Sequence, residues 1–244
     1  MAWILTIDVP SAEADAVSDQ LWTLGTNGVA EVPSGDDARL LAGFETEAEA
    51  KIARGAIGGS IAPIDPPQWA PPEAATIEVG GRTLTIDAGH SFGHGGHPTT
   101  RLCLQALERH VGGGDTVLDV GCGSGVLSLA ASTLGASAVT AIDIDPEAIT
   151  ATTENARANN LTLNISATPL ADVSGSFDIV VVNMLIAEVE PLAGDLRRVA
   201  GGLVILSGAL IEQADRWSAM FPGSEMMEAT TDGEWAGKVI RTHE

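Results

Sequence analysis

The sequence lacks any apolar run that approaches the roughly 18 residues needed to cross a membrane. Its first residues carry Asp8 and no basic cluster, so they are not typical of a signal peptide. It has only two cysteines, Cys103 and Cys122, which are too few for a disulfide framework and agree with a reducing compartment. We therefore expect a cytoplasmic protein that does not contact a membrane.

Basic side chains are also scarce. The chain has 12 Lys and Arg against 33 Asp and Glu, which gives a net charge of −21 and a pI of about 4.3. Such a surface repels phosphate backbones, so the composition argues against direct nucleic-acid binding. The acidity is explained equally well by solubility or a salt-rich habitat on the one hand and by attraction of a basic partner on the other. The sequence leaves both explanations, and the oligomeric state, open.

The first 62 residues are expected to form a small domain of their own. A strand is predicted over Ala2 to Val9, a helix after Pro10-Ser11, two strands over Gly28 to Val32 and Arg39 to Phe44, and a helix over Glu45 to Arg54. This order is typical of an α+β ferredoxin-like module. A proline-rich linker over residues 63–75 is expected to follow, and then a larger domain over residues 76–244.

The larger domain alternates strands and helices. A hairpin is expected at Thr76 to Val79 and Arg82 to Ile86, around Gly80-Gly81. The expected elements that follow are a helix from Pro98 to His110, strand Val117 to Val120, a helix to Leu134, strand Ala138 to Ile142, helix Pro146 to Asn159, strands Leu163 to Ala167 and Phe177 to Asn183, helix Ile186 to Arg198, strand Gly202 to Leu206, helix Ile211 to Met220, and strands Glu225 to Ala229 and Glu234 to Thr242. This α/β pattern predicts a doubly wound, mostly parallel sheet with an antiparallel C-terminal edge.

A glycine turn lies between the strand that ends at Val120 and the following helix. Gly121, Gly123 and Gly125 allow a sharp turn and a close approach to a ligand, and the helix start attracts an anion. A dinucleotide fingerprint would need a third glycine or alanine where Val126 stands, which disfavours an NAD site. Alternatively, the turn serves only to join the strand to the helix.

Acidic and amide side chains follow the expected strands. Asp119 precedes the glycines, while Asp143 and Asn183 each stand at the end of a later strand, where an open α/β sheet binds its ligands. A carboxylate at the position of Asp143 can accept both hydroxyls of an unphosphorylated ribose. Glycines at this spacing with an acidic residue after the next strand resemble class I S-adenosylmethionine-dependent methyltransferases. Asn183 can also be explained as a cap of the next helix.

A glycine-rich loop with three histidines precedes the helix at Pro98. His90, His94 and His97 suggest a metal triad, but no carboxylate or cysteine completes it within the loop, so we expect no metal site. Thr99 and Thr100 are candidates to cap the helix.

Six motifs together resemble the PrmA family of methyltransferases. They are F-G-x-G-x-H-P-T-T-x-L-C-L, V-L-D-V-G-C-G-S-G-x-L, I-D-I-D-P-x-A, V-V-x-N, L-S-G-x-L and G-E-W-x-x-x-x-x-R, which span about Asp87 to Arg241. The resemblance implies a protein methyltransferase that uses S-adenosylmethionine to methylate lysine ε-amines and the N-terminal α-amine of the eleventh large-subunit ribosomal protein. It also implies that an N-terminal ferredoxin-like domain recognises this basic protein.

The resemblance further implies residue roles. Thr100 contacts the cofactor, Gly121 lies under its methionine part, Asp143 binds the ribose hydroxyls and Asn183 lies beside the methyl-transfer centre as the catalytic residue. Asp172 is implied for the adenine amino group, while Phe92 and His97 belong to a loop over the site, His97 on the substrate side. The full set assigned to the cofactor is Phe92, Thr100, Asp119, Gly121, Gly123, Gly125, Asp143, Ile144, Asp172 and Asn183.

Three other functions remain open on the sequence. The same cofactor domain serves methyltransferases that act on another protein or on a small molecule. It also serves non-enzymatic modules that bind S-adenosylmethionine. An NAD-dependent dehydrogenase is the third alternative, which Val126 disfavours.

Overall fold

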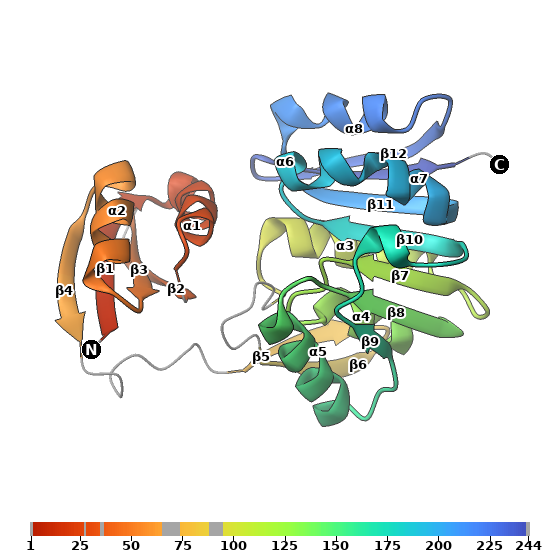
Figure 1. Ribbon diagram of the computed structural model, residues 1–244, viewed down its shortest axis with the longest axis horizontal. Coiled ribbons are helices and arrows are strands. Elements are labelled where there is room, and N and C mark those ends of the chain that lie inside the picture. Colours follow the sequence, from red (N-terminus) through yellow and green to blue (C-terminus); the bar gives the residue numbers. More distant parts are fainter. Residues whose placement is uncertain (1, 27, 35–36, 65–73, 88–94, 243–244) are drawn as a thin grey trace. The chain divides into compact units, whose positions relative to one another are not determined.

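The computed structural model describes residues 2–26, 28–34, 37–64, 74–87 and 95–242. The chain divides into two compact units, residues Met1–Glu73 and Ala74–Glu244 (Figure 1). Each unit has its own buried core. Within the described ranges, no helix is both long and apolar enough to span a membrane.

The first unit is a four-stranded antiparallel sheet with two helices. Its elements are β1 (Ala2–Pro10), α1 (Ala14–Thr23), β2 (Gly28–Ser34), β3 (Asp37–Phe44), α2 (Glu47–Ile57) and β4 (Ser60–Ile64). The strand order is β2-β3-β1-β4. Alternate residues of β1, Leu5 and Ile7, share a core with Leu40 of β3 and with Leu21 and Ala50 of the helices. Because alternate residues point to one face of a strand, both helices cover the same face of this sheet.

The strand β4 was not predicted from the sequence. It pairs with β1 at the edge of the sheet and includes Pro63, which was expected to belong to the linker. Proline lacks an N–H donor but is tolerated on an edge strand, and this is why the proline here does not end the domain. The other prolines of the expected linker, from Pro66 to Pro72, lie outside the described residues.

The second unit begins with the predicted hairpin, β5 (Ala75–Val79) and β6 (Arg82–Ile86). The turn residues Gly80 and Gly81 have φ of 56° and 75°. A two-residue turn with both φ positive matches the twist of the flanking strands and is nearly restricted to glycine and asparagine. Glycines therefore fix the register of this hairpin.

A seven-stranded sheet forms the centre of the second unit. Its elements are α3 (Pro98–His110), β7 (Thr116–Val120), α4 (Val126–Thr133), β8 (Ala138–Ile142), α5 (Pro146–Ala158), β9 (Asn164–Ser166), β10 (Phe177–Asn183), α6 (Ile186–Val189), α7 (Ala193–Val199), β11 (Ala200–Leu210), α8 (Asp215–Met220), β12 (Glu225–Asp232) and β13 (Trp235–Arg241). The order is β12-β13-β11-β10-β7-β8-β9. Strands β7 to β11 run parallel, while β13 is antiparallel to β11 and β12 to β13. The predicted fold class is confirmed.

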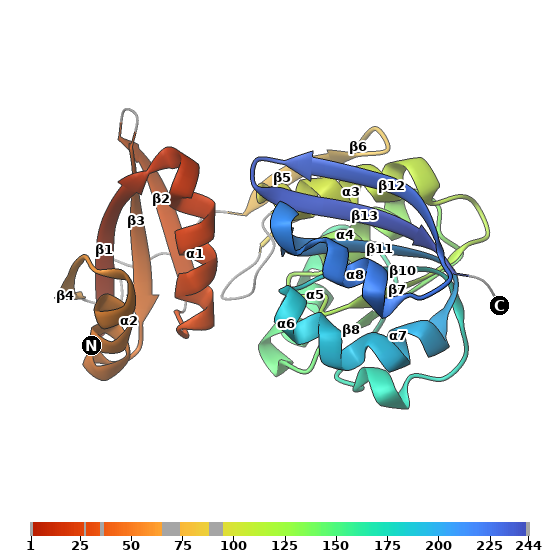
Figure 2. The same ribbon diagram turned by 90° about the horizontal axis from the view of Figure 1, so that it is seen from above.

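The sheet separates two apolar layers. Val180 and Val182 of β10 belong to the core that includes Trp217 of α8, whereas Ile179 and Val181 belong to the core that includes Leu107 of α3. Figure 2 shows α3 and α4 on one side of the sheet and α7 and α8 on the other. From β7 the chain adds β8 and β9 on one side and then β10 and β11 on the other, so the switch in strand order lies between β7 and β10. The carboxyl ends of these two strands form the expected ligand-binding crevice.

The helix predicted over Ile186 to Arg198 is interrupted. A 3-10 turn over Glu190–Leu192 separates α6 from α7. Pro191 lies in this turn, and a proline inside a helix removes a hydrogen bond and clashes with the preceding turn. The prediction of one continuous helix was therefore wrong, although helical structure does occur in this part of the chain.

Candidate functional site

The glycine turn after β7 is shaped by left-handed backbone conformations. Gly121, Gly123 and Gly125 have φ of 72°, 53° and 80°. A Cβ at Gly121 would lie 2.6 Å from the Met184 Sδ, and one at Gly125 would lie 2.7 Å from the Thr152 Cγ2. Glycine is therefore required at these two positions both by the conformation and by the close approach of neighbouring side chains.

Asp143 lies at the tip of β8 and is fixed by two backbone groups. Its Oδ2 accepts from the Gly123 N–H at 3.0 Å, and its Oδ1 accepts from the Asp145 N–H at 3.0 Å. The side chain of Asp145 in turn accepts from the Glu147 N–H at 2.8 Å and caps α5. The carboxylate of Asp143 is thereby held directly against the glycine turn, and its assignment to ribose hydroxyls remains a prediction.

Asp119 is a buried carboxyl at the end of β7. It is 1% exposed, and its Oδ2 accepts from the Ser128 hydroxyl at 2.6 Å. Among the described residues, its Oδ1 has no hydrogen-bond partner. Burial raises the pKa of Asp119 to about 7, the Ser128 hydrogen bond opposes this rise, and the negative charge of Asp143 adds to it. A buried carboxylate oxygen without a hydrogen-bond partner is costly for the fold when it is ionised, which agrees with the raised pKa.

The thiols near Asp119 are not reactive groups. Cys103 and Cys122 are both buried, and burial raises the pKa of each thiol well above its ordinary value, with the Asp119 charge adding to the effect. Neither thiolate nucleophile nor disulfide chemistry is supported at this site.

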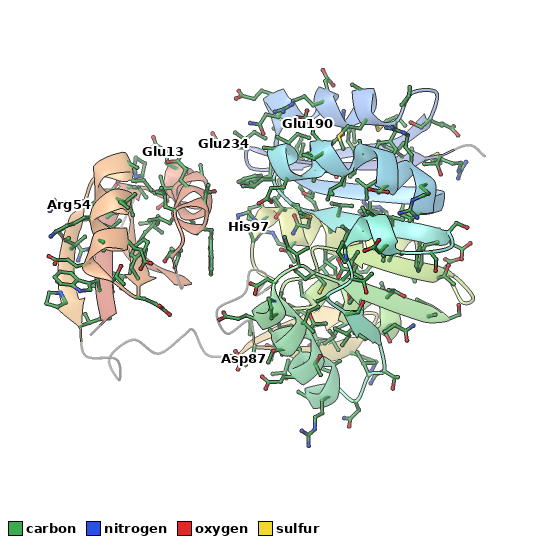
Figure 3. The ribbon with its side chains drawn as sticks, in the orientation of Figure 1. Glu13, Arg54, Asp87, His97, Glu190 and Glu234 are labelled. Carbon is green, nitrogen blue, oxygen red and sulfur yellow. The ribbon has the colours of Figure 1, made fainter. Side chains whose placement is uncertain are left out.

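Two further predicted residues meet at the carboxyl end of β10. The Nδ2 of Asn183 donates to the Thr100 Oγ1 at 3.3 Å, and Thr100 is fully buried in the first turn of α3. His97, labelled in Figure 3, caps α3 because its Nδ1 accepts from the Thr99 N–H at 3.3 Å. The His97 ring also makes an edge contact with Trp235, with ring centres 5.3 Å apart. The start of α3 is therefore fixed against both β10 and β13.

Two of the predicted cofactor residues are exposed, and a third lies outside the described residues. Ile144 follows Asp143 and its side chain is 83% exposed. Asp172 is exposed in a 3-10 turn over Leu170–Asp172. Phe92 lies outside the described residues. The roles assigned to these three residues remain predictions.

The absence of a metal site also remains a prediction. The described part of the chain contains no group of three His, Cys, Asp or Glu side chains suited to a metal ion. His90 and His94, two of the three histidines considered, lie outside that part.

Several site residues were missed in the sequence. Ser128, Thr152 and Asn155 are buried polar side chains, on α4 and α5, that contact Asp119 or the glycine turn. Ser128 is a lone polar residue inside the apolar run of α4, and this pattern was the sequence signal that could have identified it as a site residue. Buried polar side chains are nearly always hydrogen-bonded, so such positions point to a structured partner.

With this geometry in view, the family can be assigned. The family described as ribosomal protein L11 methyltransferase (PrmA) matches residues 66–243, more than half of the chain. The chain belongs to this family. The resemblance found in the sequence motifs is therefore confirmed, and the matched region contains every residue of the candidate site.

Individual relatives agree with the family. The ribosomal protein L11 methyltransferase of Geobacter metallireducens is 44% identical over 174 residues, which cover 70% of this chain and 57% of that protein. The one from Citrifermentans bemidjiense is 46% identical over 167 residues, which cover 64% of this chain and 55% of that protein. The chain thus spans little more than half the length of these curated relatives.

A solved structure is also similar. The ribosomal protein L11 methylase from Lactobacillus delbrueckii subsp. bulgaricus superposes with a TM-score of 0.60 and 37% sequence identity. The match covers 65% of this chain and 84% of that one.

Proposed function

We propose that the chain is an S-adenosylmethionine-dependent methyltransferase that methylates amines of ribosomal protein L11. The observation that carries the proposal is the position of the candidate site. Asp119, Asp143 and Asn183 lie at the carboxyl ends of three neighbouring strands of the sheet, within the region that matches the L11 methyltransferase family. The names of the curated relatives supply the substrate.

The residues present fit this cofactor. The unpartnered Oδ1 of Asp119 suits an ammonium group, which is a strong donor to a buried carboxylate. Asp143 suits ribose hydroxyls, because a carboxylate has lone pairs beyond the two that its backbone donors use. The exposed Ile144 suits an adenine ring, which would cover its apolar surface. When bound, S-adenosylmethionine supplies a methyl group on an already activated sulfonium.

We assign to Asn183 the role of binding and orienting the substrate amine. Its Nδ2 bond to Thr100 orients the side-chain amide, and its Oδ1 is the acceptor that we assign to an N–H of the amine. This contact would direct the nitrogen lone pair toward the methyl carbon, so that the N–C bond forms as the C–S bond breaks. Alignment of this kind is worth up to about 7–11 kcal/mol.

The amine must be neutral before it attacks. A free lysine amine has a pKa of about 10.4 and is mostly protonated at neutral pH. We assign no side chain as a dedicated base, and transfer of the proton to water, helped by desolvation of the amine, is sufficient for the mechanism.

The first unit is the candidate for recognising L11. Its first 62 residues carry three basic and ten acidic side chains, a net charge of −7, which attracts a basic protein. A ribosomal-protein substrate also places the proposed activity in the cytoplasm.

Two measurements test the proposal. Calorimetry should detect binding of S-adenosylhomocysteine and none of NAD, whereas the reverse would support a dehydrogenase. Methyl-labelled S-adenosylmethionine should then be incubated with the protein and with unmethylated large-subunit proteins, and the labelled band identified by mass spectrometry. Label on L11 would support the full proposal, while label on another protein or on a small molecule would retain the methyltransferase and reject the substrate. Cofactor binding without any label would indicate a non-enzymatic module.

A further inference from the structure

Asn155 of α5 and Asn159, the residue at the C-terminal cap of this helix, bind the backbone at the end of the hairpin. Asn159 accepts from the Thr85 N–H at 2.9 Å and donates to the Thr85 carbonyl at 2.7 Å. Asn155 accepts from the Asp87 N–H at 2.9 Å and donates to the Asp87 carbonyl at 2.7 Å. Thr85 and Asp87 are two residues apart, so they present these groups on the same edge of an extended strand.

The spacing of the two asparagines matches that of the strand. Four residues of an α-helix rise about 6 Å, and two residues of a β-strand rise about 7 Å. The side-chain amides of Asn155 and Asn159 therefore take the place of a neighbouring strand along β6, which otherwise pairs with β5. In this way α5 fixes the path of the chain up to Asp87, which is labelled in Figure 3.

Asn155 makes one further contact that Asn159 does not. Its Nδ2 also donates to the Ser124 carbonyl of the glycine turn at 2.9 Å, and the side chain is only 2% exposed. One turn earlier on α5, the hydroxyl of the fully buried Thr152 donates to the Gly123 carbonyl at 2.9 Å. The same face of α5 therefore holds both the glycine turn and the end of the hairpin.

We propose that Asn155 is a positioning residue that fixes the glycine turn relative to the chain at Asp87, and that this coupling sets the affinity for the cofactor. The inference rests on the proposed function, because it assumes that the glycine turn binds S-adenosylmethionine. One amide group bonds three backbone groups on two separate segments, and loss of that amide would remove all three of these hydrogen bonds at once. The turn and the hairpin end would then relax independently.

Asn159 offers a matched control for the experiment. Its Nδ2 also donates twice, to the Thr85 and Asn155 carbonyls, but not to the glycine turn. The variants Asn155→Ala and Asn159→Ala therefore each remove one acceptor and two donated hydrogen bonds, and neither adds a charge. Thermal unfolding and the Kd for S-adenosylhomocysteine would be measured for both in the full chain.

We expect both variants to lower the Tm, and only Asn155→Ala to raise the Kd, by about tenfold, a typical size for coupling between two segments. The Kd of Asn159→Ala should stay within about twofold of the wild type. An unchanged Kd for Asn155→Ala, or equal increases for both variants, would overturn the inference. If the wild type itself does not bind S-adenosylhomocysteine, the proposed function fails, and this outcome is distinct from a failure of the coupling.

A second measurement needs no variant. Coupling is reciprocal, so ligand binding at the glycine turn should stabilise the hydrogen bond that the Asp87 amide donates to Asn155. Amide exchange of the wild type, read by NMR, should slow at Asp87 by about fivefold or more when S-adenosylhomocysteine is added, and should slow less at Thr85. Unchanged exchange at Asp87 despite tight binding would overturn the inference.

Discussion

The substitution Asp119→Asn is expected to remove a pH dependence of stability. Burial raises the pKa of Asp119 from 3.8 to about 7 in the folded protein. At about 1.4 kcal/mol for each pH unit, an ionised Asp119 destabilises the unliganded fold by about 4 kcal/mol. Because the pKa of Asp119 is raised in the folded protein, the stability that its protonated form contributes is fully present below about pH 4. This contribution is lost as the pH rises from there through about 7.

The window between pH 5 and pH 8 is the most informative. The unfolded carboxyl is already mostly ionised at pH 5, so this one group should lower the free energy of unfolding by about 2–3 kcal/mol between about pH 5 and about pH 8. Asparagine does not ionise, and Asp119→Asn should therefore lack this slope. Urea denaturation across the window measures the free energy of unfolding for both proteins.

Asp178→Asn provides the control. The Thr116 backbone and hydroxyl hydrogen bonds hold the pKa of Asp178 below its ordinary value, so its contribution is lost only as the pH falls below about 4. This variant should keep the wild-type slope between pH 5 and pH 8. If Asp119→Asn kept the same slope as well, the assignment of the pH dependence to Asp119 would be refuted.

The same carboxyl should control cofactor binding. An ammonium group favours ionised Asp119, so the Kd for S-adenosylhomocysteine should rise by about tenfold per pH unit below about 7, as binding then displaces a proton. Loss of a hydrogen bond to a charged group costs about 1.5–3 kcal/mol, so Asp119→Asn should bind about 10- to 150-fold more weakly at pH 7.5 and with little pH dependence. Calorimetry would measure both effects, and wild-type binding that ignores pH would argue against this contact.

Three other substitutions test separate parts of the account. Asn183→Ala should lower kcat by about 100-fold or more and leave the Kd for S-adenosylhomocysteine within about threefold of the wild-type value. Full activity with tight binding would reject the role of Asn183 in aligning the amine. Gly125→Ala should lower the free energy of unfolding by about 2–3 kcal/mol, because a Cβ at this position would clash with Thr152. Gly81→Ala is the control: Gly81 has a φ of 75° but open space around it, so the loss should be about 1 kcal/mol. Equal losses would show that the contact with Thr152 is unimportant. Ile144→Ser should change the free energy of unfolding by less than about 0.5 kcal/mol, because Ile144 is exposed. The same variant should bind S-adenosylhomocysteine about tenfold more weakly. Unchanged binding would exclude a contact between Ile144 and the adenine.

Local sequence signals were sufficient for much of the fold. The strand Ala138–Ile142 was predicted with its observed bounds, because a short apolar run lies between polar turns. The hairpin followed from Gly80-Gly81, whose left-handed conformation selects glycine. The strand Ser60–Ile64 was missed because Pro63 reads as a linker unless the strand is known to lie at an edge.

The candidate site was predicted only in part. The position of Asp143 at the end of a strand was predicted from the sequence, whereas its hydrogen bond from the Gly123 N–H was found only in the structure. The raised pKa of Asp119 and the contacts of Asn155 could not be predicted, because burial and long-range hydrogen bonds depend on which elements pack together. Such contacts join segments that local periodicity treats separately.

Methyl transfer to ribosomal protein L11 can be followed directly. The most direct measurement is the intact mass of purified, unmethylated L11 during incubation with S-adenosylmethionine and this protein, with Asn183→Ala as the control. We expect the mass of L11 to increase by whole methyl groups with the wild type and far more slowly with the variant. An unchanged L11 mass, under conditions where the wild type binds S-adenosylhomocysteine, would contradict the claim.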